Sequence, residues 1–245
     1  MSGQPTACVL IIGNEILSGK TQDRNLQFLG FELAKLGIRL AEGRVVRDDP
    51  GAIIRHLNEL RREFTYVFTT GGIGPTHDDI TAECVAIAFG VPLELNQDAV
   101  ELLRSSGRPL NEARLKMARI PRGAELIENT VSSAPGFRIE NVFVLAGIPS
   151  VAQAMFASAV PMLVQAAPIL SASVDAYLRE GDFAEALERI QQRYPTVEIG
   201  SYPFSRDGRL GATLVARGTD RALLTKAVDE ITAAIEALGG ETAAP

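Results

Sequence analysis

The sequence predicts an α/β protein: a three-layer domain with a mostly parallel sheet, followed by a small C-terminal α+β unit. Two observations support this fold class. Through residue 165, short apolar runs typical of buried strands lead repeatedly into a loop and then into a segment with helical spacing of apolar residues. From residue 166 the order changes to strand, helix, strand, strand, helix. We therefore expect two domains, residues 1–165 and residues 166–245.

The composition is that of an ordinary globular protein. With 245 residues, of which 46% are hydrophobic and 22% charged, the chain can bury a sizeable core. A formal net charge of −6 argues against general affinity for nucleic acid or anionic lipid. Cys8 and Cys84 lie apart in apolar segments, which predicts buried thiols in a reducing compartment. The N-terminal apolar run is too short to be a signal or a membrane span, so we expect a cytoplasmic protein.

The first predicted strand, Thr6 to Ile12, leads directly into a loop that begins at Gly13. Leucines at helical spacing then continue to residue 36, and Gly37 is expected to end that helix. Glu15 lies just past the strand, where ligand contacts gather in parallel α/β sheets. Considered alone, it could equally be a solvated loop residue.

A second strand is predicted from Gly43 to Arg47, followed by two aspartates. Asp49 precedes Pro50 and is expected to cap the next helix, because proline is tolerated at the first helical position and Asp accepts the free N–H groups. Asp48 has no such structural explanation. On the same helix, His56 falls on the more polar flank and is expected at the surface.

The stretch YVFTTGGIGPTHDDITAE, residues 66–83, is the most informative motif. A buried strand from Tyr66 to Thr70 must stop at the following glycines, and helical spacing begins near Ile80. A glycine loop entering a helix can bring backbone N–H groups up to a phosphate. Asp78 and Asp79 would repel that phosphate, so we expect a divalent metal, Mg²⁺, to join them. The alternative is that both aspartates only cap the helix.

The region after residue 95 is rich in loops, with short helices predicted over Gln97 to Arg104 and Asn111 to Arg119. Lys116 and Arg119 are the basic residues best placed to neutralise an anionic ligand. Each could instead be a solvated helix residue. A later strand, Val142 to Leu145, precedes a helix that Ser150 is expected to cap.

Four of the predicted strands end in conspicuous loops, which start at Gly13, Arg47, Gly71 and Ala146. A parallel sheet would bring these loops to one edge, which predicts a single site. Beyond residue 165, two strands at 197–202 and 210–216 flank a turn at Asp207-Gly208, which favours an antiparallel pair. Asp220 is expected to begin the last helix, and residues 239–245 are expected to be frayed. This unit has no catalytic cluster and is interpreted as an accessory or oligomerisation module.

Residues 66–83 closely resemble the GGxGPTxDDxTxE signature of the molybdopterin-binding fold family. That family includes the MoaB and Mog proteins, the CinA N-terminal domain and the N-terminal domain of eukaryotic FAD synthase. GNEILSGKTQDRN at 13–25 resembles its first motif, with Asn14 where many members carry Asp. NEARLKMARIPRGAELIENTVSSAPGF at 111–137 and GSYP at 200–203 are also similar. AGIPSV at 146–151 departs from the usual LPGxP, and Val151 stands where the CinA branch tends to have Glu.

The resemblance implies a site for a pterin or nucleotide that carries a phosphate or pyrophosphate. We expect Asp48 and Asp79 to be both the metal ligands and the catalytic residues. The expected substrate-binding residues are Gly13, Glu15, Thr70, Gly71, Gly72, Gly74, Pro75, Thr76, Asp78 and Gly147. The expected partner is a small-molecule nucleotide or pterin phosphate, not nucleic acid or a membrane. A dimer or trimer would be in keeping with the family.

Three functions follow from this site. The first is metal-dependent hydrolysis of a nucleotide pyrophosphate, of the FAD or ADP-ribose type, with release of AMP. The second is adenylyl transfer to molybdopterin in molybdenum cofactor biosynthesis, which would use the same acidic residues because both reactions attack an α-phosphate. The third is non-catalytic binding, which the altered AGIPSV element favours and the retained aspartates oppose. The CinA-like motifs and the C-terminal unit favour hydrolysis.

Overall fold

The protein forms two compact units in a computed structural model that describes residues 4–206 and 208–244. The first unit comprises the described residues up to Leu33 together with Ile38–Ala166. The second comprises Ala34–Gly37 and the described residues from Ala167 onward. Each unit has its own clusters of buried apolar side chains, packed against its own sheet.

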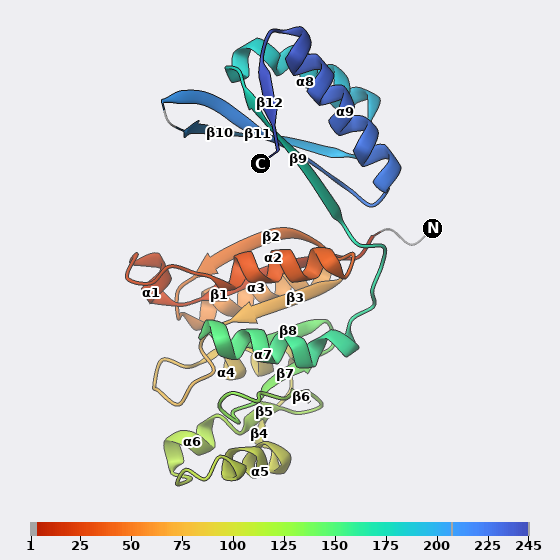
Figure 1. Cartoon of the computed structure of the whole chain (residues 1–245). Coiled ribbons are helices and arrows are strands. Elements are labelled where there is room, and N and C mark those ends of the chain that lie inside the picture. Colours follow the sequence, from red (N-terminus) through yellow and green to blue (C-terminus); the bar gives the residue numbers. More distant parts are fainter. Residues whose placement is uncertain (1–3, 207, 245) are drawn as a thin grey trace. The chain divides into compact units, whose positions relative to one another are not determined.

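The first unit is built on a six-stranded sheet with the order β2-β1-β3-β8-β7-β6 (Figure 1). Its strands are β1 Thr6–Ile12, β2 Arg39–Val46, β3 Tyr66–Thr70, β6 Glu125–Ile127, β7 Gly136–Ile139 and β8 Val142–Leu145. The strands β2, β1, β3 and β8 are parallel, whereas β7 and β6 pair antiparallel at one edge. The prediction of a mostly parallel sheet is confirmed.

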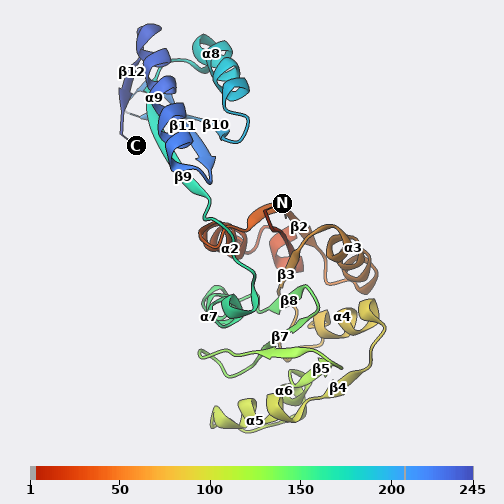
Figure 2. The same ribbon diagram turned by 90° about the vertical axis from the view of Figure 1, so that its right-hand side faces the viewer.

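Helices cover both faces of this sheet. Figure 2 shows α2 (Asn25–Lys35) and α7 (Pro149–Ala159) on one side, with α3 (Pro50–Glu63) and α4 (Thr81–Phe89) on the other. Every residue of β1 from Ala7 to Ile12 is at most 3% exposed, because the strand is covered on both faces. This double coverage explains why the strand is a continuous apolar run rather than an alternating one.

A short excursion lies between α4 and β6. It contains β4 (Leu93–Leu95), α5 (Gln97–Ser105), α6 (Glu112–Lys116) and β5 (Arg119–Pro121). β4 and β5 form a separate two-stranded antiparallel sheet. The helix predicted up to residue 119 therefore ends at 116, because residues 119–121 pair with β4 instead.

Two further boundaries differ from the prediction. β2 begins at Arg39, earlier than expected, because this edge strand alternates exposed and partly buried residues and has no continuous apolar run. α7 begins at Pro149 with Ile148 at the N-cap position, so Ser150 lies within the first turn and caps nothing. The sequence favoured serine for its capping preference, but proline at the first helical position set the helix start.

Other helix ends are as predicted. The Asp49 side chain caps α3 by accepting a hydrogen bond from the N–H of Ala52 at 2.8 Å. α4 ends at Gly90, which adopts the left-handed conformation with φ of 67°. Cys8 and Cys84 are buried free thiols, and burial raises the pKa of Cys8 to about 12 and that of Cys84 to about 11. Neither cysteine is therefore available as a thiolate nucleophile at neutral pH.

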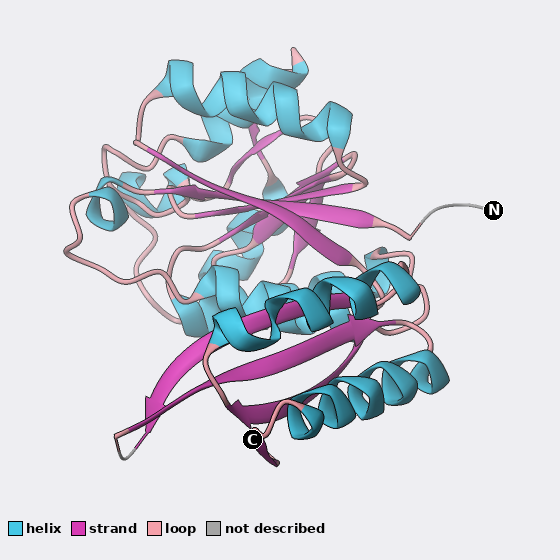
Figure 3. Cartoon of the chain, turned by 90° about the horizontal axis from the view of Figure 1, so that it is seen from above, coloured by secondary structure: helices cyan, strands magenta, loops and turns pink. Residues whose placement is uncertain are grey.

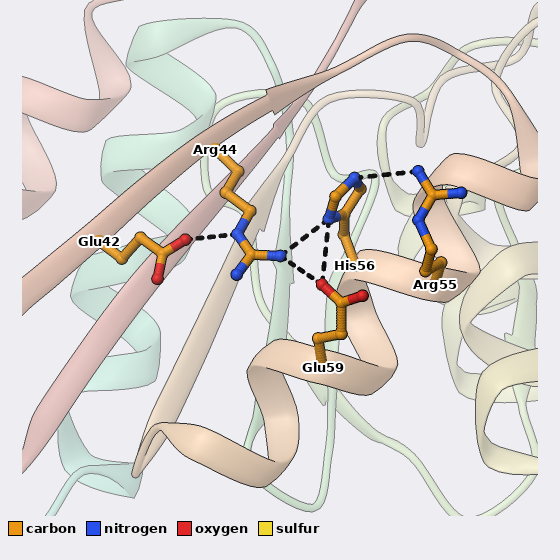
Figure 4. A network of polar contacts seen from close by, with 5 residues as sticks. All are labelled: Glu42, Arg44, Arg55, His56 and Glu59. Atoms are coloured by element: carbon orange, nitrogen blue, oxygen red, sulfur yellow. Dashed lines mark hydrogen bonds and ion pairs between the residues drawn. The ribbon is translucent and has the colours of Figure 1, made fainter.

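His56 is half-buried rather than fully exposed, and it belongs to a polar network between β2 and α3 (Figure 4). Nη1 of Arg44 lies 2.8 Å from Nδ1 of His56 and 2.5 Å from Oε2 of Glu59. Nη2 of Arg55 lies 3.3 Å from the other ring nitrogen, and Glu42 accepts a hydrogen bond from Nε of Arg44. The bond from Arg44 lowers the pKa of the Glu59 carboxyl. The network ties the edge strand to its neighbouring helix.

The second unit is a four-stranded antiparallel sheet with the order β10-β11-β9-β12 and two helices (Figure 3). Its elements are β9 Leu170–Tyr177, α8 Glu180–Arg193, β10 Glu198–Arg206, β11 Arg209–Gly218, α9 Arg221–Ala237 and β12 Glu241–Ala243. Alternate residues of β9 and β11, such as Val174 and Leu214, pack against Phe183 of α8 and Ile231 of α9. The α+β order is as predicted.

Three details of this unit concern its ends and turns. The Asp220 side chain caps α9 by accepting hydrogen bonds from the N–H groups of Ala222 and Leu223. Residues 241–243 form β12 on β9, so the prediction of a frayed segment is wrong there. The predicted Asp207-Gly208 turn lies partly outside the described residues, because Asp207 is not described, although β10 and β11 do form the expected antiparallel pair. No helix within 4–206 and 208–244 is both long and apolar enough to cross a bilayer.

Candidate functional site

Four parallel strands end level with one another at the carboxyl edge of the first sheet. Ile12 of β1 pairs with Val46 of β2, while Thr70 of β3 pairs with Ile11 of β1 and Leu145 of β8. The four loops that follow begin at Gly13, Arg47, Gly71 and Ala146. The convergence of these loops at one edge is therefore confirmed.

The turn after β3 requires glycine at two consecutive positions. A Cβ on Gly71, whose φ is 102°, would lie 2.1 Å from the carbonyl oxygen of Ile12. A Cβ on Gly72, whose φ is 67°, would lie 2.2 Å from the Thr81 hydroxyl. Thr81 fixes the turn by donating its hydroxyl to the Gly71 carbonyl and its N–H to the Gly72 carbonyl, both at 2.9 Å. The glycines thus allow β1, the loop and the start of α4 to pack at backbone distance.

Asp78 and Asp79 are bound to the loop itself and do not cap α4. Oδ2 of Asp79 accepts a hydrogen bond from the N–H of Thr76 at 2.8 Å, and the Thr76 hydroxyl contacts both carboxylates, at 2.6 Å for Asp78. The N-cap of α4 is Ile80, with no side-chain cap. The alternative that these aspartates only cap the helix is therefore wrong. The hydrogen bond from Thr76 lowers the pKa of the Asp78 carboxyl, which stays ionised at neutral pH.

The Thr76 hydroxyl, which has a single proton to donate, lies between the negatively charged carboxylates of Asp78 and Asp79. A hydroxyl donates one hydrogen bond at a time, so only one of the two carboxylates can accept it at any moment. The other carboxylate then faces a lone pair. A cation shared by the two carboxylates would remove this conflict, whereas an anion would increase it.

The loop after β1 contacts the loop after β2, as expected for neighbouring strands of the sheet. Oδ2 of Asp48 accepts a hydrogen bond from the N–H of Asn14, the first residue of the short helix α1 (Asn14–Leu17), at 2.8 Å. The Glu15 carboxylate folds back against Gly13, where an added Cβ would lie 2.6 Å from both carboxylate oxygens. Asp48, Gly13 and Glu15 therefore form one neighbourhood at the ends of β1 and β2.

A narrow pocket of about 60 Å³ opens beside the glycine loop. The residues in its wall that carry charge or belong to the loop are Gly72, Ile73, Gly74, Asp79, Glu83, Lys116 and Arg119. Lys116 also reaches the loop, where its Nζ donates a hydrogen bond to the Thr76 carbonyl. The two basic residues indicated by the sequence do lie at the pocket.

Three backbone N–H groups of the glycine loop have no acceptor among the described residues. Gly72, Ile73 and Gly74 line the pocket, and their N–H groups donate to no atom of another residue within the described chain. Gly71, by contrast, donates its N–H to the carbonyl of Leu145 at 3.2 Å. Three consecutive unpaired N–H groups at a glycine turn are a feature that can bind an anion.

The structure brings together only part of the predicted site. Asp79, Gly72 and Gly74 line the pocket, whereas Asp48 and Glu15 do not. Among the described residues, no group of three or more His, Cys, Asp or Glu is arranged to hold a metal. Joint binding of one metal by Asp48 and Asp79 therefore stays a prediction.

Two polar residues at this edge escaped the sequence-based prediction. Asn25 is 3% exposed, and its Nδ2 donates to the Gly147 carbonyl at 2.8 Å while its Oδ1 has no partner among the described atoms. Its place at the end of the 13–25 motif was the available signal. Glu83, the last residue of the 66–83 motif, lines the pocket and was indicated only by that position.

The fold and these loops define an α/β protein with a pocket at the carboxyl edge of a parallel sheet, in which unpaired backbone donors lie beside acidic and basic side chains. The chain belongs to the molybdopterin-binding domain family, because residues 8–165 match the family model for the probable molybdopterin binding domain. Residues 168–239 match the FAD synthase middle domain.

Relatives cover both parts of the chain. A protein of Aeropyrum pernix is 34% identical over 262 aligned residues, which cover 98% of this chain and 97% of that protein. A CinA-like protein of Gloeobacter violaceus is 31% identical, over 96% of this chain and 58% of its own length. The crystal structure of a CinA protein of unknown function from Thermoplasma acidophilum matches 64% of this chain and 98% of its own, with 34% identity and a TM-score of 0.61.

Proposed function

We propose that this protein is a divalent-metal-dependent nucleotide pyrophosphatase that hydrolyses FAD or ADP-ribose and releases AMP. The observation that carries the proposal is the pocket itself. Gly72, Ile73 and Gly74, whose N–H groups have no acceptor within the described residues, line it together with Asp79 and Lys116. Free N–H groups and a lysine favour a phosphate, and a carboxylate beside a phosphate favours a bridging cation.

The residues present fit Mg²⁺ in the manner usual for phosphate chemistry. Mg²⁺ is commonly held by one or two carboxylates and completes its shell with phosphate oxygens and water, so a cage of three protein ligands is not needed. Asp79 is the loop carboxylate at the pocket, and Glu83 of α4 also lines it. When bound, the metal would polarise a phosphoryl oxygen and lower the pKa of an attacking water.

Two aspartates, Asp48 and Asp78, are candidates for the second carboxylate ligand of the metal. Asp48 follows β2, two strands away from β3, which corresponds to roughly 10 Å across the sheet at the backbone. It would reach the same metal by extending across the Gly13 loop. Asp78 is held against the same Thr76 hydroxyl as Asp79 and is the nearer alternative.

The remaining pocket residues bind and orient the substrate. The loop N–H groups would hold one phosphate, and Lys116 would neutralise charge while keeping the loop closed through the Thr76 carbonyl. The guanidinium of Arg119 makes no hydrogen bond or ion pair within the described residues, so it is available to the ligand.

A second candidate function is adenylyl transfer to molybdopterin. The match of residues 8–165 to the probable molybdopterin binding domain supports it. The same pocket would serve, because transfer and hydrolysis both attack an α-phosphate and differ in whether the acceptor is a pterin phosphate or water. A pterin-binding or nucleotide-binding protein without turnover is the third outcome.

The test is AMP release from FAD and from ADP-ribose with Mg²⁺, Mn²⁺ or Co²⁺. Asp79→Ala is expected to lower the rate at least about 100-fold, in the range seen when a group that stabilises the transition state is removed. Asp229→Ala, which removes an exposed carboxylate from α9, serves as the matched control and should keep the wild-type rate. Parallel measurement of Asp48→Ala and Asp78→Ala identifies the second ligand.

Each alternative result has a defined meaning. Wild-type rates in Asp79→Ala would show that the catalytic assignment is wrong. If the unaltered protein released no AMP from either substrate, hydrolysis would be rejected, and molybdopterin with ATP would be the next substrate pair to test.

A further inference from the structure

The narrow pocket is too small for a whole nucleotide. Its volume of about 60 Å³ suits a group the size of a phosphate with a metal or a few waters. Pockets that enclose a small-molecule ligand usually measure roughly 300–1,000 Å³. The remainder of any nucleotide or pterin ligand must therefore lie outside the pocket.

A wider groove of about 370 Å³ adjoins the pocket. Leu95, Glu112, Leu115, Lys116 and Arg119 line it, and the last two also line the pocket. The two spaces thus share a wall that carries two positive charges. The groove is also more open to solvent than the pocket, so a flat group could lie along it.

The small sheet of β4 and β5 connects the two spaces. Leu93 of β4 lines the pocket and Leu95 lines the groove, and residues two apart in a strand point to the same face. Arg119 of β5 lies directly opposite Leu95 in the antiparallel register, so their side chains are neighbours on that face. One continuous face therefore runs from the phosphate end to the groove.

We infer that this groove binds the planar heterocyclic ring of the ligand whose phosphate occupies the narrow pocket, and that Leu95 is a specificity-determining residue. The inference rests on the proposed function for the placement of the phosphate. Leu95 is 47% exposed and offers an apolar surface to one face of a ring. Arg119, whose side chain has no polar partner within the described residues, offers a guanidinium of the kind that stacks on aromatic faces.

On this inference, the segment from β4 to β5 is the part of the protein that binds the ring of the ligand. It supplies every residue of the groove: Leu95 and Arg119 from the small sheet, Glu112, Leu115 and Lys116 from α6. The loops at the carboxyl edge of the main sheet hold the phosphate, and the excursion holds the ring. The class of ring accepted would then depend on the excursion rather than on the glycine loop.

The test compares AMP with ribose 5-phosphate, which has the same phosphate and ribose but no base. Calorimetric titration of each into the full-length protein with Mg²⁺ should show that AMP binds at least tenfold more tightly. Leu95→Asn and Leu95→Ala should weaken AMP binding at least about threefold, because apolar contact with the ring is lost, and leave ribose 5-phosphate unchanged. Ile87→Asn is the matched control, since Ile87 is 56% exposed and lines neither space.

Several results would overturn the inference: equal binding of the two ligands by the wild type, unchanged AMP binding in both Leu95 variants, or equal losses for AMP and ribose 5-phosphate. Circular dichroism of each variant confirms that it is folded. The binding assay does not need turnover. If AMP binding depended on the base and on Leu95 but no AMP were released from FAD or ADP-ribose, hydrolysis would be rejected and the role of the groove supported. If AMP were released but binding did not depend on the base or on Leu95, hydrolysis would be supported and the role of the groove rejected.

Discussion

The two units of the protein place their carboxylates in opposite surroundings. In the second unit, Asp175 on β9 is 1% exposed, forms an ion pair with Arg206 and accepts a hydrogen bond from the Thr213 hydroxyl at 2.5 Å. In the first unit, Asp79 lies in an exposed loop, where its partners are the N–H and hydroxyl of Thr76. No lysine or arginine of the described chain forms an ion pair with Asp79.

This difference indicates that Asp175 contributes to the stability of the fold, whereas Asp79 is suited to binding a ligand. A buried carboxylate with a cationic partner and a hydroxyl donor is fully satisfied by the protein, so its contribution is to the folded state. A carboxylate beside unpaired N–H groups and without a cation is incompletely satisfied, and a ligand can supply what is missing. The contrast favours a ligand site in the first unit and a structural role for Asp175 in the second.

The largest expected effect comes from the turn that builds the site. Gly71→Ala should lower the free energy of unfolding by about 3 kcal/mol, because alanine would be strained at positive φ and its Cβ would meet the Ile12 carbonyl oxygen. Gly90→Ala is the control. Gly90 also has positive φ, at 67°, but no atom of the described residues lies within 4 Å of its added Cβ, so only about 1 kcal/mol is expected. Urea unfolding of both variants measures the difference, and equal costs would contradict the close approach of β1 to the loop.

A smaller effect on stability, with none on activity, is expected in the second unit. Asp175→Ala should lower the free energy of unfolding by about 2 kcal/mol, since it removes a charged hydrogen-bond acceptor and leaves Arg206 and Thr213 without their partner. AMP release at 25 °C should be unchanged. Asp79→Ala should show the reverse, a large loss of activity with stability within about 0.5 kcal/mol of wild type. Loss of activity in folded Asp175→Ala would break the division between the units.

Much of this arrangement follows from local sequence patterns. The strand from Tyr66 to Thr70, the Asp49 cap and the convergence of four loops were all predictable, because each depends on apolar continuity, a capping preference or strand direction. Interactions between distant segments were not. His56 of α3 contacts Arg44 of β2, and β12 pairs with β9, although most of the sequence of the second unit lies between those two strands. Neither contact leaves a periodic signal in the sequence.

The site shows the same limit. The glycine loop and Asp79 were predicted from one stretch of chain, and the structure places them at one pocket. The groove depends on the register that sets Arg119 opposite Leu95, which no local pattern shows, and the sequence predicted a helix through residue 119 instead. Asn25 was likewise overlooked, because it contacts the carbonyl of Gly147, a residue far from it in the sequence.

The smallest expected effect is a pH dependence confined to Asp175. The hydrogen bond from Thr213 and the ion pair with Arg206 hold the pKa of this carboxyl below its usual value of 3.8. A carboxyl with a lowered pKa in the folded state stabilises the protein above its unfolded pKa, and this stabilisation is lost as the pH falls through the folded pKa. Asp175→Asn, a neutral variant of the same shape, should therefore be less stable than wild type by about 1 kcal/mol at pH 7. That difference should remain constant down to about pH 4 and shrink below it. Urea unfolding of both proteins from pH 7 to pH 3 measures it, and a difference that grew on acidification would show that Asp175 is not the paired, ionised group of the second unit.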